Sequence, residues 1–354
     1  MKYLKKLGNR IFVEGLAGMA HGLFATLIIG TIIQQIGTLI GGTIGDFIFV
    51  IGKVAASLTG AGIGVGVAYR FKEGSLVVLS SATAGMVGAF ASKILAGGVL
   101  VDGAIVFAGP GEPLGAFLAA YLGIEIGHLV AGKTKVDILV SPLVTIGTGS
   151  VVGLILGPPI SKFMLALGEM INWGTEQQPL LMGIIVSVLM GMILTLPISS
   201  AALGVILNLS GLAAGAATIG CCCNMVGFAV ASYRENKVGG LLAQGIGTSM
   251  LQVPNIVRKP LIWLPAISSS AILGPIGTMV LHMTNNATGS GMGTAGLVGQ
   301  IMTWQTMTAT QAPEIVLGKI LLIQSILPAI VTLLISEFMR KKQWIKYGDM
   351  KLDL

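Results

Sequence analysis

The sequence carries very little charge for its length. Of its 354 residues, 10% are Asp, Glu, Lys or Arg, whereas an ordinary soluble domain has roughly 25%. So few charges cannot cover a water-soluble globule of this size, so the solvent around most of the chain must be lipid. The longest segments outside the apolar runs are about 164–178, 284–313 and the tail after Arg340. We therefore expect no soluble domain.

The sequence also lacks the patterns of metal, nucleotide and nucleic-acid sites. Its three cysteines are consecutive, Cys221 to Cys223, and consecutive residues of a helix point about 100° apart, so they cannot converge on one ion. No Walker motif, G-x-S-x-G or metal-ligand spacing is present. No basic face interleaved with aromatics suggests nucleic acid as a partner. We expect no cofactor and no catalytic group.

Apolar residues and glycine fill the chain instead. Hydrophobic residues make up 54% and glycine occurs 52 times, as expected where membrane helices approach closely through small residues. Since a spanning helix needs about 20 apolar residues, the pattern predicts an all-α polytopic membrane protein with ten transmembrane helices. The predicted spans are 10–36, 43–69, 75–100, 104–132, 137–163, 179–207, 211–233, 238–257, 260–283 and 314–339. We interpret the first as an uncleaved helix rather than a signal peptide.

The basic residues predict the orientation. With the N-terminus in the cytoplasm, fifteen of the 21 Lys and Arg residues lie on the cytoplasmic side, and three, Lys162, Arg234 and Lys237, lie outside. This bias follows the positive-inside rule and places both termini in the cytoplasm. The net charge of +7 then indicates contact with anionic lipid of the bilayer.

Two longer patterns suggest internal organisation. Tyr69-Arg70 and Tyr233-Arg234 follow similar apolar runs, which suggests half-repeats over 10–165 and 179–340. Five spans in each half would make the repeat inverted, as in many transporters. The Gly-, Thr- and Asn-rich segment 284–313 is long for a loop. It predicts a re-entrant hairpin buried in protein, with an ordinary surface loop as the alternative.

Ionisable residues within the predicted spans are the first candidates for a site, because they are costly there. Glu112 precedes Pro113, which suits the start of a helix. Glu125 and His128 are three residues apart and share a helical face. Together they can bind a solute hydroxyl or relay protons. The alternatives are helix capping by Glu112, and an ion pair or an approach to the inner surface by Glu125 and His128.

Uncharged and weakly ionisable polar residues form a second group of candidates. Asn224 lies in the middle of a predicted span, and His282, Asn285 and Asn286 lie at the start of the predicted hairpin. We predict that they contribute to substrate binding. The alternative for each is a hydrogen bond that holds two helices together.

Several motifs resemble a known family. They are GPGEPLGAF at 109–117, LVSPLVTI at 139–146, LGPPI at 156–160, CCCNMVGFAVASYRENKVGGLLAQGIGTSM at 221–250, VPNIVRKPLIWLPAI at 253–267 and LGPIGTMVLHMTNNATGSGMGTAGLVG at 273–299. Over nearly the whole chain they resemble bacterial phosphotransferase-system EIIC-like membrane proteins, a group that includes perfringolysin-regulator-like proteins. The resemblance implies a sugar-translocating, homodimeric subunit of the bacterial plasma membrane that depends on a cytosolic EIIB-type chain. It also implies that a carboxylate and a histidine hold the sugar, with Glu125 or Glu112 and His128 as the matching positions.

Three functions follow from these patterns. The first is a transporter subunit that moves a small polar solute, a sugar, by alternating access. The second is a membrane sensor or regulator that keeps the scaffold without transport. The third is a proton-coupled carrier of another small molecule, in which Glu125 and His128 carry the proton.

Overall fold

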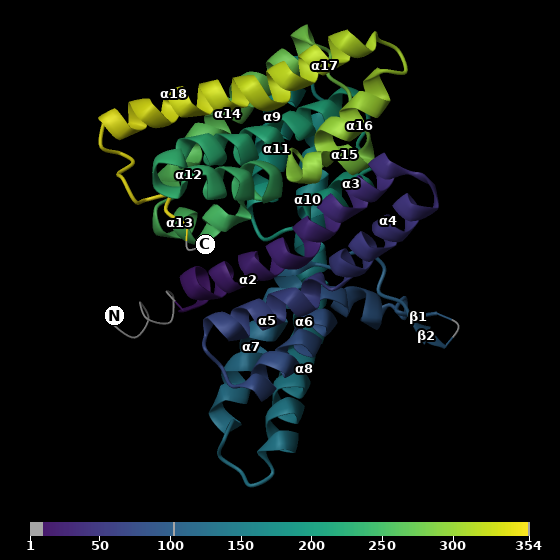
Figure 1. Cartoon of the computed structure of the whole chain (residues 1–354), viewed down its shortest axis with the longest axis vertical. Helices are drawn as coiled ribbons and strands as arrows, with labels where there is room; N and C mark the ends of the chain where they lie inside the picture. The colour runs from purple at the N-terminus through teal and green to yellow at the C-terminus, as the bar shows by residue number, and fades with distance from the viewer. Residues whose placement is uncertain (1–9, 102, 353–354) are drawn as a thin grey trace. The chain divides into compact units, whose positions relative to one another are not determined.

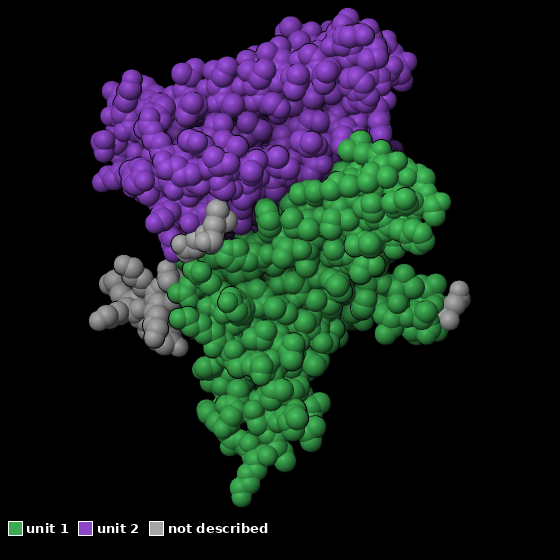
Figure 2. Space-filling model, in the orientation of Figure 1, with its two compact units in different colours: residues 1–164 green, residues 165–354 purple. Residues whose placement is uncertain are grey.

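The computed structural model describes residues 10–101 and 103–352, and they are almost entirely helical (Figure 1). The chain divides into two compact units, Met1–Met164 and Leu165–Leu354 (Figure 2). Among the described residues the only paired strands are β1 (Leu100–Val101) and β2 (Ala104–Ile105), which form a short antiparallel hairpin. The predicted all-α class is confirmed.

Seven described helices are long and apolar enough to cross a membrane, or eight if the bent pair α4 (Gly42–Ser57) and α5 (Thr59–Arg70) is one span. The predicted count of ten is not reached. In the predicted span 179–207 the helix α9 (Pro179–Thr195) is short, with 17 residues. The predicted span 238–257 is a series of short helical pieces. The seven are Arg10–Ile40, α6 (Ser75–Leu95), α7 (Pro113–Val130), α8 (Asp137–Thr175), α11 (Gly211–Ala231), Pro260–Val280 and Pro313–Lys341.

Glycines bring the helices of unit 1 into backbone contact. The first helix runs through the π-turn η1 (Arg10–Gly15), α2 (Leu16–Leu23), the π-turn η2 (Phe24–Ile28) and α3 (Ile29–Ile40). A methyl group at Gly22 would collide with the carbonyl of Gly62, and one at Gly64 with the carbonyl of Ser81. Contacts this close let α2, α5 and α6 pack without large side chains between them, as expected in lipid.

Unit 2 is built around α11, which is mostly buried. It packs against α9, α14 (Leu264–Pro275) and α18 (Leu327–Lys341). The contacts fix directions: Ser187 of α9 lies against Gly220, and Thr195, two turns further on, bonds Asn224 of α11. Both helices therefore run the same way. The chain between them, residues 196–210 with α10 (Ser200–Ile206), must return to the end where α11 begins.

One end of unit 2, which we call its basic end, comprises residues 233–258 and the tail 342–352. Between α11 and α14 the chain folds through α12 (Tyr233–Leu242), the π-turn η3 (Ala243–Gly247), η4 (Ser249–Gln252), α13 (Val253–Arg258) and η5 (Pro260–Trp263). In Figure 1 α12 and α13 lie at one end of these helices. The tail is held there, because Asn236 donates to Met350 O and accepts from Leu352 N, both at 2.8 Å.

The basic end corrects one sequence prediction. Glu235 accepts a 2.8 Å hydrogen bond from Arg340, and Lys259 Nζ lies 2.6 Å from Asp349 Oδ2. Arg234 and Lys237 therefore share a side with Arg258, Lys259 and Arg340, whereas we expected them on opposite sides. The error came from counting 238–257 as a span. Lys237, just before it, has a positive φ of 52°, and the range itself is divided among four short helical pieces. The inverted repeat stays a prediction.

The opposite end of unit 2 carries the segment predicted to be a hairpin. Its helices are the π-turn η6 (Ile276–Val280), α15 (Ala287–Ser290), η7 (Ala295–Leu297) and α16 (Val298–Met307), followed by α17 (Pro313–Leu321) and the π-turn η8 (Leu322–Ile326). Figure 1 shows α15, α16 and α17 at the end away from α12. Residues 289–291 and 293–296 are buried. The part of the segment around residues 289–296 is thus buried in protein as a hairpin, whereas residues 309–310 and 312–313 are exposed. Its re-entry into the membrane stays a prediction.

Candidate functional site

The hairpin enters unit 2 along the central helix α11. Thr218 donates to Gly289 O at 3.3 Å, Cys221 Sγ lies 3.8 Å from Ser290 O, and Thr294 donates to Met225 Sδ at 3.4 Å. From Thr218 to Met225 the hairpin follows about 10 Å of helix. The chain turns back at Gly293, Gly296 and Leu297, whose φ values of 53°, 53° and 59° make the tip tight.

Asn285 anchors the base of the hairpin. Its side-chain amide donates to Thr218 Oγ1 at 2.8 Å, Thr303 Oγ1 at 3.0 Å and Gly299 O at 3.1 Å. Gln324 also donates to Thr303, at 2.9 Å. One buried amide thus ties both arms of the hairpin to α11, which sets the hairpin's depth.

Asn286 and His282 have different places near that base. Asn286 caps α15, because its side chain accepts from Gly289 N at 3.0 Å, as asparagine does at helix starts. Its amide nitrogen has only the thioether of Met302, at 3.5 Å, among the described residues. His282 is exposed and left-handed, with φ 47°. The structure therefore joins Asn285 and Asn286 to the hairpin and leaves the His282 side chain outside it.

The hairpin meets the returning segment 196–210. Ser200 donates a 2.6 Å hydrogen bond to Gly291 O. A methyl group at Gly204 would collide with Ser290 Oγ, and one at Gly291 with the Ser200 carbonyl. Pro197 and Ser199 lie in the helix break just before this contact. Broken helices that face each other expose main-chain groups in the way solute sites of transporters do.

Asn224 lies further along α11 in a fully paired network. Its Oδ1 accepts from Trp263 Nε1 at 2.8 Å and from Thr195 at 3.1 Å, and its amide donates to Gly220 O at 3.1 Å. Thr195 continues the network to Ser249, at 2.8 Å. All of these groups are buried and uncharged. The network joins α9, α11, α14 and the basic end, which favours the helix-linking alternative for Asn224.

Sequence analysis missed buried amides near the hairpin whose hydrogen-bonding capacity is open, Gln300 and Gln324. Gln300 of α16 has a buried Oε1 with no hydrogen-bond partner among the described residues, and its nitrogen has only Cys222 Sγ, at 3.7 Å. Thr218 and Thr303 were missed as well. The available signal was the spacing of Gln300 and Thr303, one helical turn apart in an apolar stretch.

The ionisable candidates form a different network in unit 1. Arg10 Nε lies 2.5 Å from Glu125 Oε1, and Arg10 Nη2 lies 3.5 Å from Glu73 Oε1. His128 Nδ1 lies 2.8 Å from Glu73 Oε2. The Arg10 guanidinium also sits 4.1 Å from the centre of the Phe71 ring, a cation–π contact. Glu125 thus pairs with Arg10, and His128 pairs with Glu73, at the end of unit 1 where Arg70 and Lys72 lie. These contacts favour the ion-pair alternative for Glu125 and His128.

Glu112 has the capping position that its sequence suggested. It is the N-cap of α7, and its carboxylate accepts from Leu114 N at 3.4 Å. Its own N–H donates to Ala89 O at 2.8 Å, which fixes the start of α7 against α6. The described contacts of Glu112 include neither Glu125 nor His128.

The comparison with protein families agrees with this architecture. The family model described as "Phosphotransferase system, EIIC" matches residues 13–352, nearly the whole chain. The chain belongs to this family and is a multi-pass membrane component of a phosphotransferase-type transport system. No curated protein matches the chain.

Proposed function

We propose that this chain carries a small uncharged polar solute, a sugar or a related polyol, across the bacterial plasma membrane, and that the site lies where the hairpin meets segment 196–210. The observation that carries the proposal is the hairpin itself, which brings main-chain and amide groups into the interior of unit 2. Every hydrogen-bond partner described for residues 285–300 is uncharged. A neutral, hydroxyl-rich solute fits such groups, since hydroxyls both donate and accept.

Gln300 is the residue we propose for direct contact. A buried acceptor without a partner costs about 1–3 kcal/mol, and a solute hydroxyl would satisfy it. Asn286, at the base of the hairpin, offers a donor whose present partner is a weak thioether. Asn285 and Asn224 would position the hairpin and the helices rather than touch the solute.

Opening requires the Ser200–Gly291 contact to separate. The hairpin and the segment 196–210 are each bounded by turns or breaks, so a small movement of one against the other would uncover the site. Alternate opening toward the two ends of unit 2 would carry the solute across.

Orientation follows from the basic end. Residues 233–258 and 340–352 of unit 2 contain eight Lys and Arg residues, and Arg10, Arg70 and Lys72 lie together at one end of unit 1. The positive-inside rule assigns both ends to the cytoplasm. A phosphoryl-donating EIIB-type partner would dock from that side.

Thermal unfolding of the purified protein tests the proposal. A solute that binds the folded state raises the unfolding midpoint by mass action. In a panel of neutral sugars, polyols, sugar acids and nucleosides, we expect a shift with one neutral class. Gln300→Leu should abolish the shift, whereas the matched Gln305→Leu, at an exposed position of the same helix, should keep it.

Three results would contradict this proposal. A shift with sugar acids alone would require a cation at the site. A shift lost in Glu125→Gln but kept in Gln300→Leu would move the site to the unit 1 network and support the prediction made from sequence. No shift with any compound, in protein that unfolds cooperatively, would favour the sensor or regulator.

A further inference from the structure

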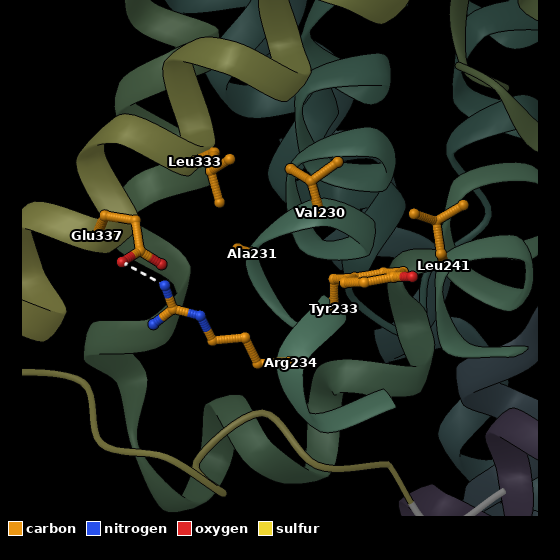
Figure 3. Close-up of a pocket in the computed structure, with 7 residues that line it drawn as sticks. All are labelled: Val230, Ala231, Tyr233, Arg234, Leu241, Leu333 and Glu337. Carbon is orange, nitrogen blue, oxygen red and sulfur yellow. Dashed lines mark hydrogen bonds and ion pairs between the residues drawn. The ribbon is translucent and has the colours of Figure 1, made fainter. Parts of the chain in front are cut away.

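A groove of about 500 Å³ opens on the outer surface of unit 2, close to its basic end. It lies between the last turn of α11, the helix α12 and the helix α18 (Figure 3). Val230, Leu241 and Leu333 line its apolar part, and Arg234 and Glu337 close its polar end. It is separate from the hairpin site and has no role in the transport proposal.

The polar end presents both signs of charge. Arg234 Nη2 lies 3.0 Å from Glu337 Oε2, and this is the only hydrogen bond described for either side chain. A guanidinium has five N–H donors and a carboxylate two acceptor oxygens, so most of their capacity is open. The Arg234 side chain is 61% exposed and that of Glu337 29%. Both can therefore bind an outside group while keeping their own contact.

The apolar end continues into the lipid-facing surface. Leu333 lies one turn before Glu337 on α18, so the two share a face. The neighbouring α18 residues Ile330, Leu334 and Phe338 are exposed large apolar side chains. An occupant of the groove thus has its apolar part in the bilayer and its polar part at the basic end, which is the arrangement of a phospholipid.

We propose that this groove binds a phospholipid with an ethanolamine headgroup, with the phosphate at Arg234, the ammonium at Glu337 and an acyl chain along Leu333. Paired opposite charges match a zwitterionic headgroup. An anionic lipid such as phosphatidylglycerol would satisfy Arg234 but be repelled by Glu337. A choline headgroup carries no N–H, so it cannot donate to the carboxylate as an ethanolamine ammonium does.

Native mass spectrometry of the detergent-purified chain tests the proposal. The protein is titrated with phosphatidylethanolamine, phosphatidylcholine and phosphatidylglycerol of identical acyl chains. We expect the ethanolamine lipid to bind about fivefold more tightly than either of the others, the effect of roughly one solvent-exposed ion pair.

Four variants assign the contacts. Glu337→Gln should remove the preference for ethanolamine over choline and make the glycerol lipid the best ligand. Arg234→Gln should weaken all three lipids. Leu333→Trp should fill the apolar part and weaken all three without changing their order. Glu314→Gln, at an exposed position of α17 at the other end of unit 2, is the control and should change nothing.

Each other outcome overturns the proposal. Equal binding of the ethanolamine and choline lipids would remove the role of Glu337, as would a preference that survives Glu337→Gln. Strongest binding of phosphatidylglycerol to the unaltered protein would make this an anionic-lipid site. A lipid-free dimer that Leu333→Trp disrupts would make the groove an interface between copies.

Discussion

The candidate polar groups of the two units lie in different surroundings. Unit 1 collects charged side chains, Arg10, Glu73, Glu125 and His128, at one end, where the His128 side chain is 60% exposed. Unit 2 buries uncharged ones, Asn224, Asn285 and their hydroxyl partners, in its interior. Burying a charge costs much more than burying an amide that is fully hydrogen-bonded. In this membrane protein, therefore, charge marks the ends and neutral polarity marks the interior.

This contrast changes which residues are expected to bind a solute. From sequence, the ionisable side chains ranked first because they are costly in lipid. Glu125 and His128 have partners that explain them, whereas buried amides of unit 2 such as Gln300 keep open hydrogen-bonding capacity. The family resemblance predicts that a carboxylate and a histidine hold the sugar. This stays a prediction, and the Glu125→Gln variant in the unfolding experiment tests it.

The largest effect is expected from labelling, because the answer is all or none. If both basic ends face the cytoplasm, Lys237→Cys and Thr134→Cys will not react with a membrane-impermeant maleimide in intact cells and will react after permeabilisation. Glu176→Cys, exposed between α8 and α9, should react in intact cells. The native cysteines are fully buried and should add little background.

If Lys237→Cys were labelled from outside while Thr134→Cys stayed protected, the two basic ends would lie on opposite sides of the membrane. That result would restore the arrangement first predicted from the sequence, with Arg234 outside, and it would contradict the shared side of Glu235 and Arg340.

The neutral interior should contribute more stability than the charged end. Asn224→Ala leaves the buried Trp263 N–H without its acceptor, which should cost about 2 kcal/mol. Glu125→Gln removes a partly exposed pair and should cost at most about 1 kcal/mol. Denaturation in detergent measures both, with the exposed Asn172→Ala as the control for Asn224. If Glu125→Gln lowered the free energy of unfolding more than Asn224→Ala does, the charged end of unit 1 would contribute more stability than the neutral interior of unit 2.

The fold class and the hairpin could be predicted from sequence, because both depend on composition. Scarce charge and long apolar runs require membrane helices, and a Gly-, Thr- and Asn-rich segment between two spans requires protein around it. The folding of residues 238–257 into short helical pieces rather than a span could not be predicted. Its hydropathy resembles that of a span, but Gln244, Gln252 and Asn255 bond one another and the tail, which hydropathy does not register. Gln300 was missed because an isolated amide in a Gly-rich stretch has no motif.

The weakest predicted effect concerns the tail at the basic end and its dependence on pH. Burial by itself raises the pKa of Asp349, but the hydrogen bond with Lys259 and that from Lys346 N outweigh it, and the pKa lies below its ordinary 3.8. The charged form is therefore favoured in the docked tail. The contribution of the charged Asp349 to tail docking is complete above the ordinary pKa and is lost as the pH falls through the lowered value.

Hydrogen exchange of residues 343–352 should be slow at pH 7 and, after correction for the intrinsic rate, less protected below about pH 4. Lys259→Gln should loosen the tail at pH 7 by less than about 1 kcal/mol, and the exposed Lys346→Gln should not. Equal protection in the unaltered protein and both variants would mean that the amide contacts of Asn236, Gln252 and Asn255 hold the tail alone. The ion pair of Lys259 and Asp349 would then add no stability at the basic end.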